Sequence, residues 1–295
     1  MKLSTANEIV FCEGSAGKPL AVFIHGMGMD VRVWSSPADA RVLGGKYSLS
    51  ILLRKGEGDM RSLFMELAER GFPVLAWSQL RPVGPIMSAV AELQSLLASF
   101  KRHTGNGVVL IGHSRGGLIA RKYLQQESSP VRGLFTLAAP HQGTTLARWA
   151  AVLAPAASVA SQALEKYKKN SAKSAFHRIL LFFTSTGLKE LLPESPFYAG
   201  LKDLRHKSIL YVSAGGTDPD LFRVGDFPLS EVARLVLPGK SLPEELKKGH
   251  GDGMVSAASS VLPFSAEHRD FPVNHVEILF DKRVRELLIK SMLTC

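Results

Sequence analysis

The chain has 295 residues, of which 45% are hydrophobic and 21% are charged, with 26 glycines, 16 prolines and 2 cysteines. This composition is typical of a globular protein and excludes collagen-like, disordered and disulfide-stapled chains. The 36 Lys and Arg residues outnumber the 26 Asp and Glu residues, which gives a net charge of +10. No run of Lys or Arg exceeds 2 residues and no nucleic-acid-binding motif is present, so we expect no nucleic acid as a partner.

Targeting and membrane-spanning segments are not expected. No stretch reaches the roughly 18 consecutive apolar residues that span a bilayer, and residues 1–8 lack the apolar core of a signal peptide. Cys12 and Cys295 stand at opposite ends of the chain, without the spacing of metal ligands. We therefore predict a cytoplasmic protein in which neither cysteine binds zinc.

Apolar runs and segments of helical periodicity alternate in the first half of the chain. The runs are short and bounded by glycine or proline, whereas the segments between them repeat apolar residues every three or four positions. This alternation predicts an α/β fold, with helices on both faces of a doubly wound, mostly parallel sheet. We expect strands at 20–24, 49–53, 74–77, 108–111, 134–138, 208–213 and 269–273, and helices at 62–70, 86–97, 118–124 and 276–292.

A long excursion, residues 141–206, interrupts this alternation. It is too long for a loop, and its apolar residues have helical spacing, with Phe176 and Phe183 on one face. We predict that 1–140 and 207–295 form the α/β core and that 141–206 is an inserted helical cap, or lid, whose Phe176 and Phe183 bind substrate. An ordinary packed pair of helices is the alternative. The excursion carries 9 Lys/Arg against 4 Asp/Glu, which indicates either a solvated basic face or a contact with an anionic lipid surface.

The sequence Gly-His-Ser-Arg-Gly-Gly at 112–117 directly follows an expected strand and begins an expected helix. A G-x-S-x-G turn in this context is a nucleophile elbow, which exposes the serine hydroxyl at the carboxyl edge of the sheet. Side chains two positions before or after the serine would collide with the neighbouring strand or helix, which explains the two glycines. We predict Ser114 as the nucleophile.

A second glycine motif, His-Gly-Met-Gly at 25–28, follows the first expected strand. A backbone N–H in such a loop lies beside the nucleophile, so we expect the N–H groups of Met27 and Arg115 to bind the oxyanion of a tetrahedral intermediate. We expect His25 to pack within this loop at the substrate site and not to act as a catalyst. His113, which precedes the nucleophile, is also expected at the substrate site.

These motifs resemble those of the α/β-hydrolase superfamily, and within it the bacterial lipase and esterase branch. Further matching sequences are Pro-His-Gln-Gly-Thr at 140–144, Gly-Asp-Gly-Met-Val-Ser at 251–256 and Asn-His-Val-Glu at 274–277. The resemblance covers about residues 20–145 and 208–290. It implies the α/β-hydrolase fold and a triad in the chain order Ser, Asp, His.

Position along the chain indicates the catalytic base, and the family resemblance indicates the acid. His275 follows the last expected strand by two residues at the carboxyl edge, whereas His268 lies at the opposite end of that strand, so His275 is the predicted base. Asp218 and Asp220 follow the strand 208–213, which is the usual place of the acid in the superfamily. Asp252 matches the lipase D-G-x-V pattern instead, and the resemblance favours it as the acid that orients the imidazole.

Some lipases of this branch carry calcium near the catalytic aspartate, which raises the same question here. The further acids Asp218, Asp220, Asp226 and Asp270 do not have the spacing of an EF-hand loop. Aspartates in loops are more often turn residues. We predict no metal and no cofactor, with calcium near Asp252 as the alternative.

The predicted function is that of a serine hydrolase, a lipase or esterase that cleaves carboxylic or lipid esters through an acyl-enzyme. Acyl transfer and the cleavage of thioesters or amides use the same residues and are alternatives. A third possibility, from another class, is a ligand-binding protein that has kept the fold and lost the chemistry.

Overall fold

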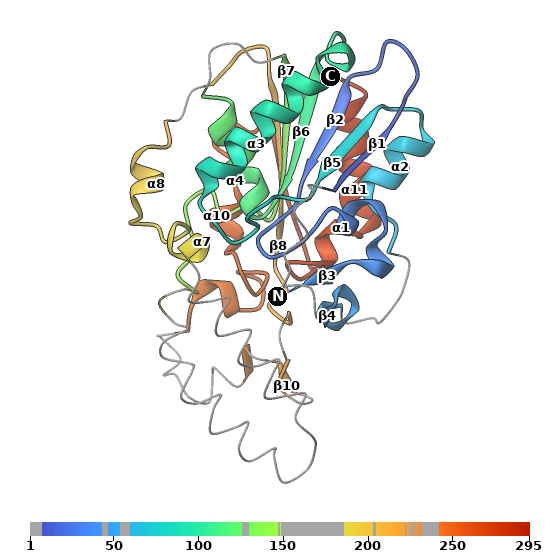
Figure 1. Cartoon of the computed structure of the whole chain (residues 1–295). Helices are drawn as coiled ribbons and strands as arrows, with labels where there is room; N and C mark the ends of the chain where they lie inside the picture. Colours follow the sequence, from blue (N-terminus) through green and yellow to red (C-terminus); the bar gives the residue numbers. More distant parts are fainter. Residues whose placement is uncertain are drawn as a thin grey trace.

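The protein is described from a computed structural model (Figure 1). The structure describes residues 8–42, 47–53, 60–125, 130–146, 148, 186–202, 205–221, 223–224, 227–228, 230–231 and 242–295. Within these ranges, a seven-stranded sheet has the order β1-β5-β2-β6-β7-β8-β11. Its strand β1 is antiparallel to β5, and the other neighbours are parallel, as predicted. The strands are β1 (Ile9–Cys12), β2 (Leu20–Ile24), β5 (Val74–Trp77), β6 (Val108–His113), β7 (Val131–Leu137), β8 (Leu210–Gly216) and β11 (Glu267–Phe271).

The order of the strands creates a switch point between β2 and β6. The chain adds β5 on one side of β2 and then crosses to the other side, where β6, β7, β8 and β11 follow. Loops that leave the carboxyl ends of strands at such a point diverge and form a crevice. The register pairs Ile24 with Gly112, so the loop after β2 and the turn after β6 begin side by side.

Helices cover both faces of the sheet (Figure 1). On one face lie α3 (Ile86–Ser99) and α4 (Arg115–Tyr123), which pack together, and on the other lie α1 (Arg32–Ser35), α2 (Leu63–Glu69) and α11 (Lys282–Met292). Shorter elements are α7 (Thr186–Lys189), α8 (Pro196–Ala199), α10 (Ala257–Ser260), η1 (Pro37–Asp39), η2 (Leu49–Leu52), η3 (Lys101–His103), η5 (Glu244–Leu246), η6 (Glu277–Leu279), β3 (Arg41–Val42), β4 (Tyr47–Ser48), β9 (Arg223–Val224) and β10 (Phe227–Pro228).

Side-chain caps determine where two of the helices begin. The Ser62 hydroxyl accepts a hydrogen bond from the Met65 N–H at the start of α2, and the Asp281 carboxylate accepts from Arg283 N–H and Val284 N–H at the start of α11. Each cap satisfies backbone donors that have no partner within the helix. The predicted helix 62–70 therefore agrees closely with α2. The predicted helix 276–292 is divided by the Asp281 cap into η6 and α11, which begins at Lys282.

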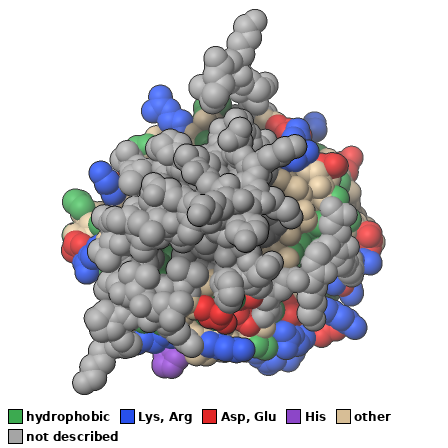
Figure 2. All heavy atoms as spheres, turned by 90° about the horizontal axis from the view of Figure 1, so that it is seen from below, with side chains coloured by type: hydrophobic (Ala, Val, Ile, Leu, Met, Phe, Trp, Pro, Cys, Tyr) green, Lys and Arg blue, Asp and Glu red, His purple; other side chains and the backbone are tan. Residues whose placement is uncertain are grey.

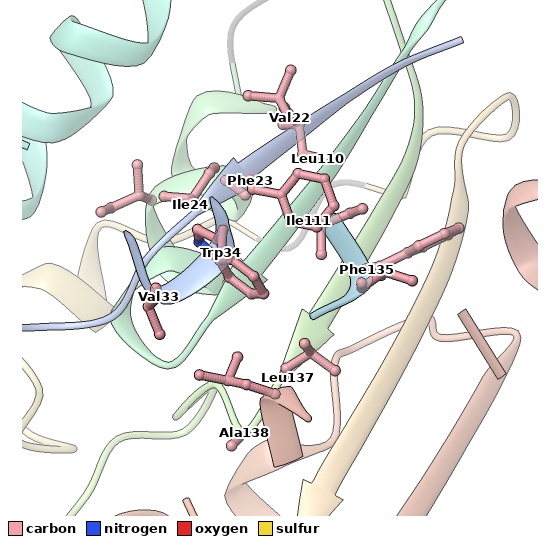
Figure 3. Close-up of a cluster of buried hydrophobic side chains, with 14 of the residues drawn as sticks. Val22, Phe23, Ile24, Val33, Trp34, Leu110, Ile111, Phe135, Leu137 and Ala138 are labelled. Carbon is pink, nitrogen blue, oxygen red and sulfur yellow. The ribbon is translucent and has the colours of Figure 1, made fainter. Parts of the chain in front are cut away.

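The core lies between the sheet and the helices on its two faces. Figure 3 shows part of it, where Phe23 of β2 meets Trp34 of α1 at a ring-centroid distance of 5.0 Å. Phe23, Trp34 and Phe135 are fully buried. The central strands are buried on both faces, which explains why β2, β5 and β6 appear in the sequence as continuous apolar runs.

One predicted strand was wrong and one observed strand was missed. Residues 49–53 were expected as a strand, but residues 49–52 form the 3₁₀ helix η2, which begins where the Ser48 hydroxyl accepts a hydrogen bond from Ser50 N–H. A short apolar run does not distinguish a strand from a buried helical turn, and the capping serine decides the outcome here. Strand β1 was missed in the sequence, although its residues, Ile-Val-Phe-Cys, form an apolar run as long as that of β5.

Only the two ends of the excursion 141–206 lie within the described residues. The predicted substrate-binding residues Phe176 and Phe183 lie outside them, and the division into core and cap stays a prediction. Figure 2 shows the molecule from below, where basic and acidic side chains of the described residues both lie around the margin of the face. None of the helices in the described ranges has the length and apolarity needed to cross a membrane.

Candidate active site

Ser114 lies in a strained turn between β6 and α4. Its backbone has φ 53° and ψ −126°, outside the conformations that non-glycine residues favour. The glycines around it permit this turn, since a Cβ on Gly112 would lie 2.5 Å from Gly117 N and one on Gly116 would lie 2.2 Å from Ile24 O. The turn therefore has the geometry expected of a nucleophile elbow.

His275 and Asp252 are joined in the loops after β11 and η5. The His275 Nδ1 lies 2.8 Å from Asp252 Oδ2, and both side chains are buried. The other carboxylate oxygen, Oδ1, accepts hydrogen bonds from Met254 N–H (2.9 Å) and Val255 N–H (2.7 Å). The carboxylate is thus oriented by its own loop, and the imidazole is oriented by the carboxylate.

A glycine at the end of β8 makes room for Asp252. A Cβ on Gly216 would lie 2.7 Å from the Asp252 Cβ and 2.7 Å from Val273 O. The loop that carries Asp252 therefore packs against the end of β8, although Asp252 is 36 residues later in the chain (252 minus 216). Asp218, the alternative acid, follows β8 directly, and its Oδ1 accepts the Asp220 N–H instead (3.1 Å).

Two buried residues hold the backbone around His275. The side chain of Asn274 accepts hydrogen bonds from Val276 N–H and Glu277 N–H through Oδ1, and donates through Nδ2 to the carbonyls of Leu52 and Asp220. The Nε2 of His113 donates to the His275 carbonyl at 2.8 Å. The loop around His275 is therefore held by contacts within it and by bonds to Leu52, Asp220 and His113.

Ser114 and His275 line one pocket, which encloses about 520 Å³ including its open mouth. No hydrogen bond joins these two side chains in the part of the chain that the structure describes. Side chains without charge form the rest of the wall, and the polar residues among the lining are Ser114, His113 and His275. The full lining is Met27, Met29, Val42, Leu52, His113, Ser114, Leu188, Leu191, Leu221, Met254, His275 and Val276.

The far end of the excursion contributes to this pocket through Leu188 and Leu191. Gly187 N–H donates to Val83 O at 3.1 Å, and a Cβ on Gly187 would lie 2.6 Å from that oxygen. The Glu190 carboxylate accepts the Ile86 N–H at the start of α3 (2.9 Å). The wall is thereby fastened to the core at two points.

The first residues of the excursion are fastened by a buried carboxylate that the sequence analysis missed. Glu245 Oε1 accepts from Thr145 N–H at 2.6 Å and from the Thr144 hydroxyl at 3.1 Å, and that hydroxyl also lies 2.8 Å from Met254 O. The motif at 140–144 is therefore tied to the loop that carries Asp252. In the sequence, Glu245 is one of several charged residues in Glu-Glu-Leu-Lys-Lys at 244–248, which gave no signal of this role.

His25 does not line the pocket. Its ring is fully buried, with Nδ1 donating to Gly26 O at 2.8 Å and Nε2 accepting the Gln79 N–H at 3.0 Å. It packs in the loop, as expected, but its contacts within the protein do not support a contact with substrate. Gln79 was missed in the sequence, where the available signal was a polar residue two positions after a buried strand.

The buried side chains of His25 and His113 are neutral. Burial lowers the pKa of His25 to about 4, and burial, together with nearby His275, lowers the pKa of His113 well below its usual value. Burial also lowers the pKa of Arg115 to about 10, so its side chain keeps its charge at neutral pH.

The described residues contain no group of three or more His, Cys, Asp or Glu side chains that could hold a metal ion. Asp226, one of the acids considered for calcium, lies outside the described residues.

Comparison with known proteins identifies the family. The model of the alpha/beta hydrolase family matches residues 21–262, which is more than half of the chain. The chain therefore belongs to the alpha/beta hydrolase family, and the predicted α/β-hydrolase fold is confirmed. Membership supports hydrolase activity. A search of curated protein sequences found no match.

Solved structures share this fold at low sequence identity. The mature lipase BlEst2 of Bacillus licheniformis is 15% identical, with a TM-score of 0.61 over 97% of this chain and 98% of its own. The propeptide form of that lipase is 15% identical, with a TM-score of 0.60 over 98% of this chain and 54% of its own. A carboxylesterase of the thaumarchaeon Nitrososphaera gargenis is 14% identical, with a TM-score of 0.51 over 99% of this chain and 97% of its own.

The buried neutral histidines predict a loss of stability in mild acid. Below pH 6.5 the unfolded chain takes up protons that His25, His113 and His141 cannot accept while folded, so the free energy of unfolding falls as the pH decreases from 6.5 toward 4. Each such histidine contributes a slope of up to about 1.4 kcal/mol per pH unit. Urea unfolding at pH 7.5, 6 and 5 should show this fall in the free energy of unfolding. His141→Gln should reduce the slope by the contribution of one histidine, up to about 1.4 kcal/mol per pH unit. An identical slope in the variant would contradict the prediction.

Proposed function

We propose that the protein is a serine hydrolase that cleaves carboxylic esters, with Ser114 as nucleophile, His275 as base and Asp252 as acid. The observation that carries this proposal is the pocket that Ser114 and His275 both line, with His275 held by the buried carboxylate of Asp252 at 2.8 Å. A strained serine, an imidazole and an orienting carboxylate in one place are the parts that nucleophilic acyl transfer needs.

The reaction follows from these groups. Asp252 keeps the proton of the His275 imidazole on Nδ1, so that Nε2 accepts the proton of the Ser114 hydroxyl as Oγ forms a bond to the acyl carbon. The carbonyl π electrons move to oxygen, and the tetrahedral intermediate then expels the alkoxide, which takes the proton from His275. Water repeats the sequence, bonds to the acyl carbon and releases the acid and free Ser114.

The oxyanion of the intermediate needs backbone donors. We assign these to the N–H groups of Met27, in the loop after β2, and Arg115, at the first position of α4. The residue after the nucleophile and a residue of the loop after β2 come together because Ile24 and Gly112 are neighbours in the sheet. The positive end of the α4 dipole also favours negative charge at this position.

The apolar wall suggests the part of the substrate that is bound. Burial of apolar surface contributes roughly 25 cal/mol per Å² and selects for size more than for a polar headgroup. We therefore propose an acyl chain as the occupant of the pocket and a small acyl ester or lipid as the substrate. Contact of the basic excursion with an anionic lipid surface is part of the same proposal.

Replacement of Ser114 by alanine tests the nucleophile. We expect Ser114→Ala to abolish both hydrolysis of p-nitrophenyl esters and covalent labelling by a fluorophosphonate, with an unchanged circular dichroism spectrum, because the hydroxyl lies at the pocket and not in the core. Labelling without turnover of esters would direct the search to thioesters, amides or acceptor alcohols. Labelling that persists in the variant would place the nucleophile elsewhere, and an unlabelled wild type would indicate a binding protein.

A pair of aspartate variants tests the acid. Asp252→Asn should lower kcat by up to about 10⁴-fold, because the amide no longer holds the required tautomer of His275. Asp218→Asn is the matched control, since Asp218 is buried nearby and bonds within its own loop. Steady-state kinetics of both variants would refute the assignment if Asp218→Asn were the more damaging change.

The pocket wall predicts the preference for acyl length. Leu191→Ala should lower kcat/KM for octanoyl esters by about 10-fold relative to acetyl esters, which corresponds to the contacts of one apolar side chain. Leu146→Ala is the control, because Leu146 is equally buried in the excursion but does not line the pocket. A p-nitrophenyl ester series measures both. The same ratio of octanoyl to acetyl rates in both variants would remove Leu191 from the acyl site.

A further inference from the structure

The side chain of Arg115 is fully buried beside the nucleophile, where a cation is costly. Its guanidinium has neutral hydrogen-bond partners: Nη1 donates to Gln79 Oε1 and Nη2 donates to Gly84 O, both at 2.6 Å. An apolar side chain would fill this space without desolvating a charge. The burial of the cation therefore calls for a role that an apolar residue could not perform.

Gln79 connects this guanidinium to the loop after β2. Its side-chain Nε2 donates to His25 O at 3.0 Å, and its backbone N–H donates to His25 Nε2 at 3.0 Å. Gln79 is itself 5% exposed. Its amide thus binds the loop 25–28 with its nitrogen and Arg115 with its oxygen.

The two segments that Gln79 joins are the two that supply the oxyanion donors in the proposed function. One is the loop of Met27, and the other is the first turn of α4, to which Arg115 belongs. The segments also touch directly, since a Cβ on Gly116 would meet Ile24 O at 2.2 Å and His25 O at 3.0 Å. That contact limits how closely they approach, and the Gln79 amide limits how far they separate.

We propose that Gln79 and the side chain of Arg115 are positioning residues that hold the two oxyanion donors at a fixed spacing. The inference rests on the proposed function and adds residues to it. The planar fork of Arg115 fits the role, because its two terminal nitrogens bind Gln79 and the Gly84 carbonyl at the same time. Donors aimed in advance at the developing oxyanion lower the barrier without reorganisation, so a loosened spacing reduces turnover more than ground-state binding.

The experiment compares matched oxoesters and thionoesters in Gln79→Met and Arg115→Lys. The first variant preserves volume and removes the amide, and the second preserves charge and removes the fork. Sulfur accepts hydrogen bonds weakly, so the ratio of oxoester to thionoester kcat/KM reports the oxyanion donors. We expect each variant to lower kcat for the oxoester by about 10- to 100-fold, to change KM by less than about 2-fold, and to lower the ratio by about 10-fold. The double variant should lower kcat no further than either single variant does, since both substitutions break the same connection between Gln79 and Arg115.

Arg121→Lys is the control. Arg121 lies on the same helix, is also buried and donates to a backbone carbonyl, that of His141, at 3.1 Å. Arg121→Lys should leave the ratio of oxoester to thionoester kcat/KM unchanged. A wild-type ratio in both Gln79→Met and Arg115→Lys, or failure of both to fold, would overturn the inference and leave these residues with a role in stability alone. A wild type that neither hydrolyses esters nor reacts with a fluorophosphonate would overturn the proposed function instead.

Discussion

The contact between the end of β2 and the first turn of α4 constrains the rest of the site. Gly116 lies so close to Ile24 O that no side chain fits between them. This approach follows from the parallel pairing of β2 with β6, which places Ile24 beside Gly112. Ser114 is forced into its unusual backbone conformation within the same turn. The strain of about 1 to 3 kcal/mol is sustained because the surrounding core is well packed.

Around this contact, several buried polar side chains are hydrogen-bonded to one another or to the backbone. Asp252 bonds to His275, and the loop that carries His275 is held by Asn274 and His113. Each link removes a buried donor or acceptor that would otherwise lack a partner, which stabilises one arrangement over its neighbours. The geometry of the site is therefore a consequence of hydrogen-bond satisfaction as much as of the sheet.

The sequence was most informative where a residue's role is local. The bounds of β2 and β5 and the glycines around Ser114 could be predicted because they depend on neighbours in the chain. The choice of Asp252 over Asp218 needed a family resemblance, and the space that Gly216 leaves for it is visible only in three dimensions. Gln79 and Glu245 could not be found, since their partners are 36 or more residues away. The periodicity of apolar residues in the sequence contains no information on such distant polar pairs.

The construction of the pocket wall has a consequence for how substrate range can change. Leu188 and Leu191 belong to the predicted insertion between β7 and β8, whereas Ser114 follows β6 and the hydrogen-bonded pair Asp252 and His275 comes after β8. Exchange of this segment between relatives would therefore be a modular route to new selectivity. A transplanted segment would have to preserve a glycine at 187 and an acceptor at 190, because these are its anchor points on residues 83–86.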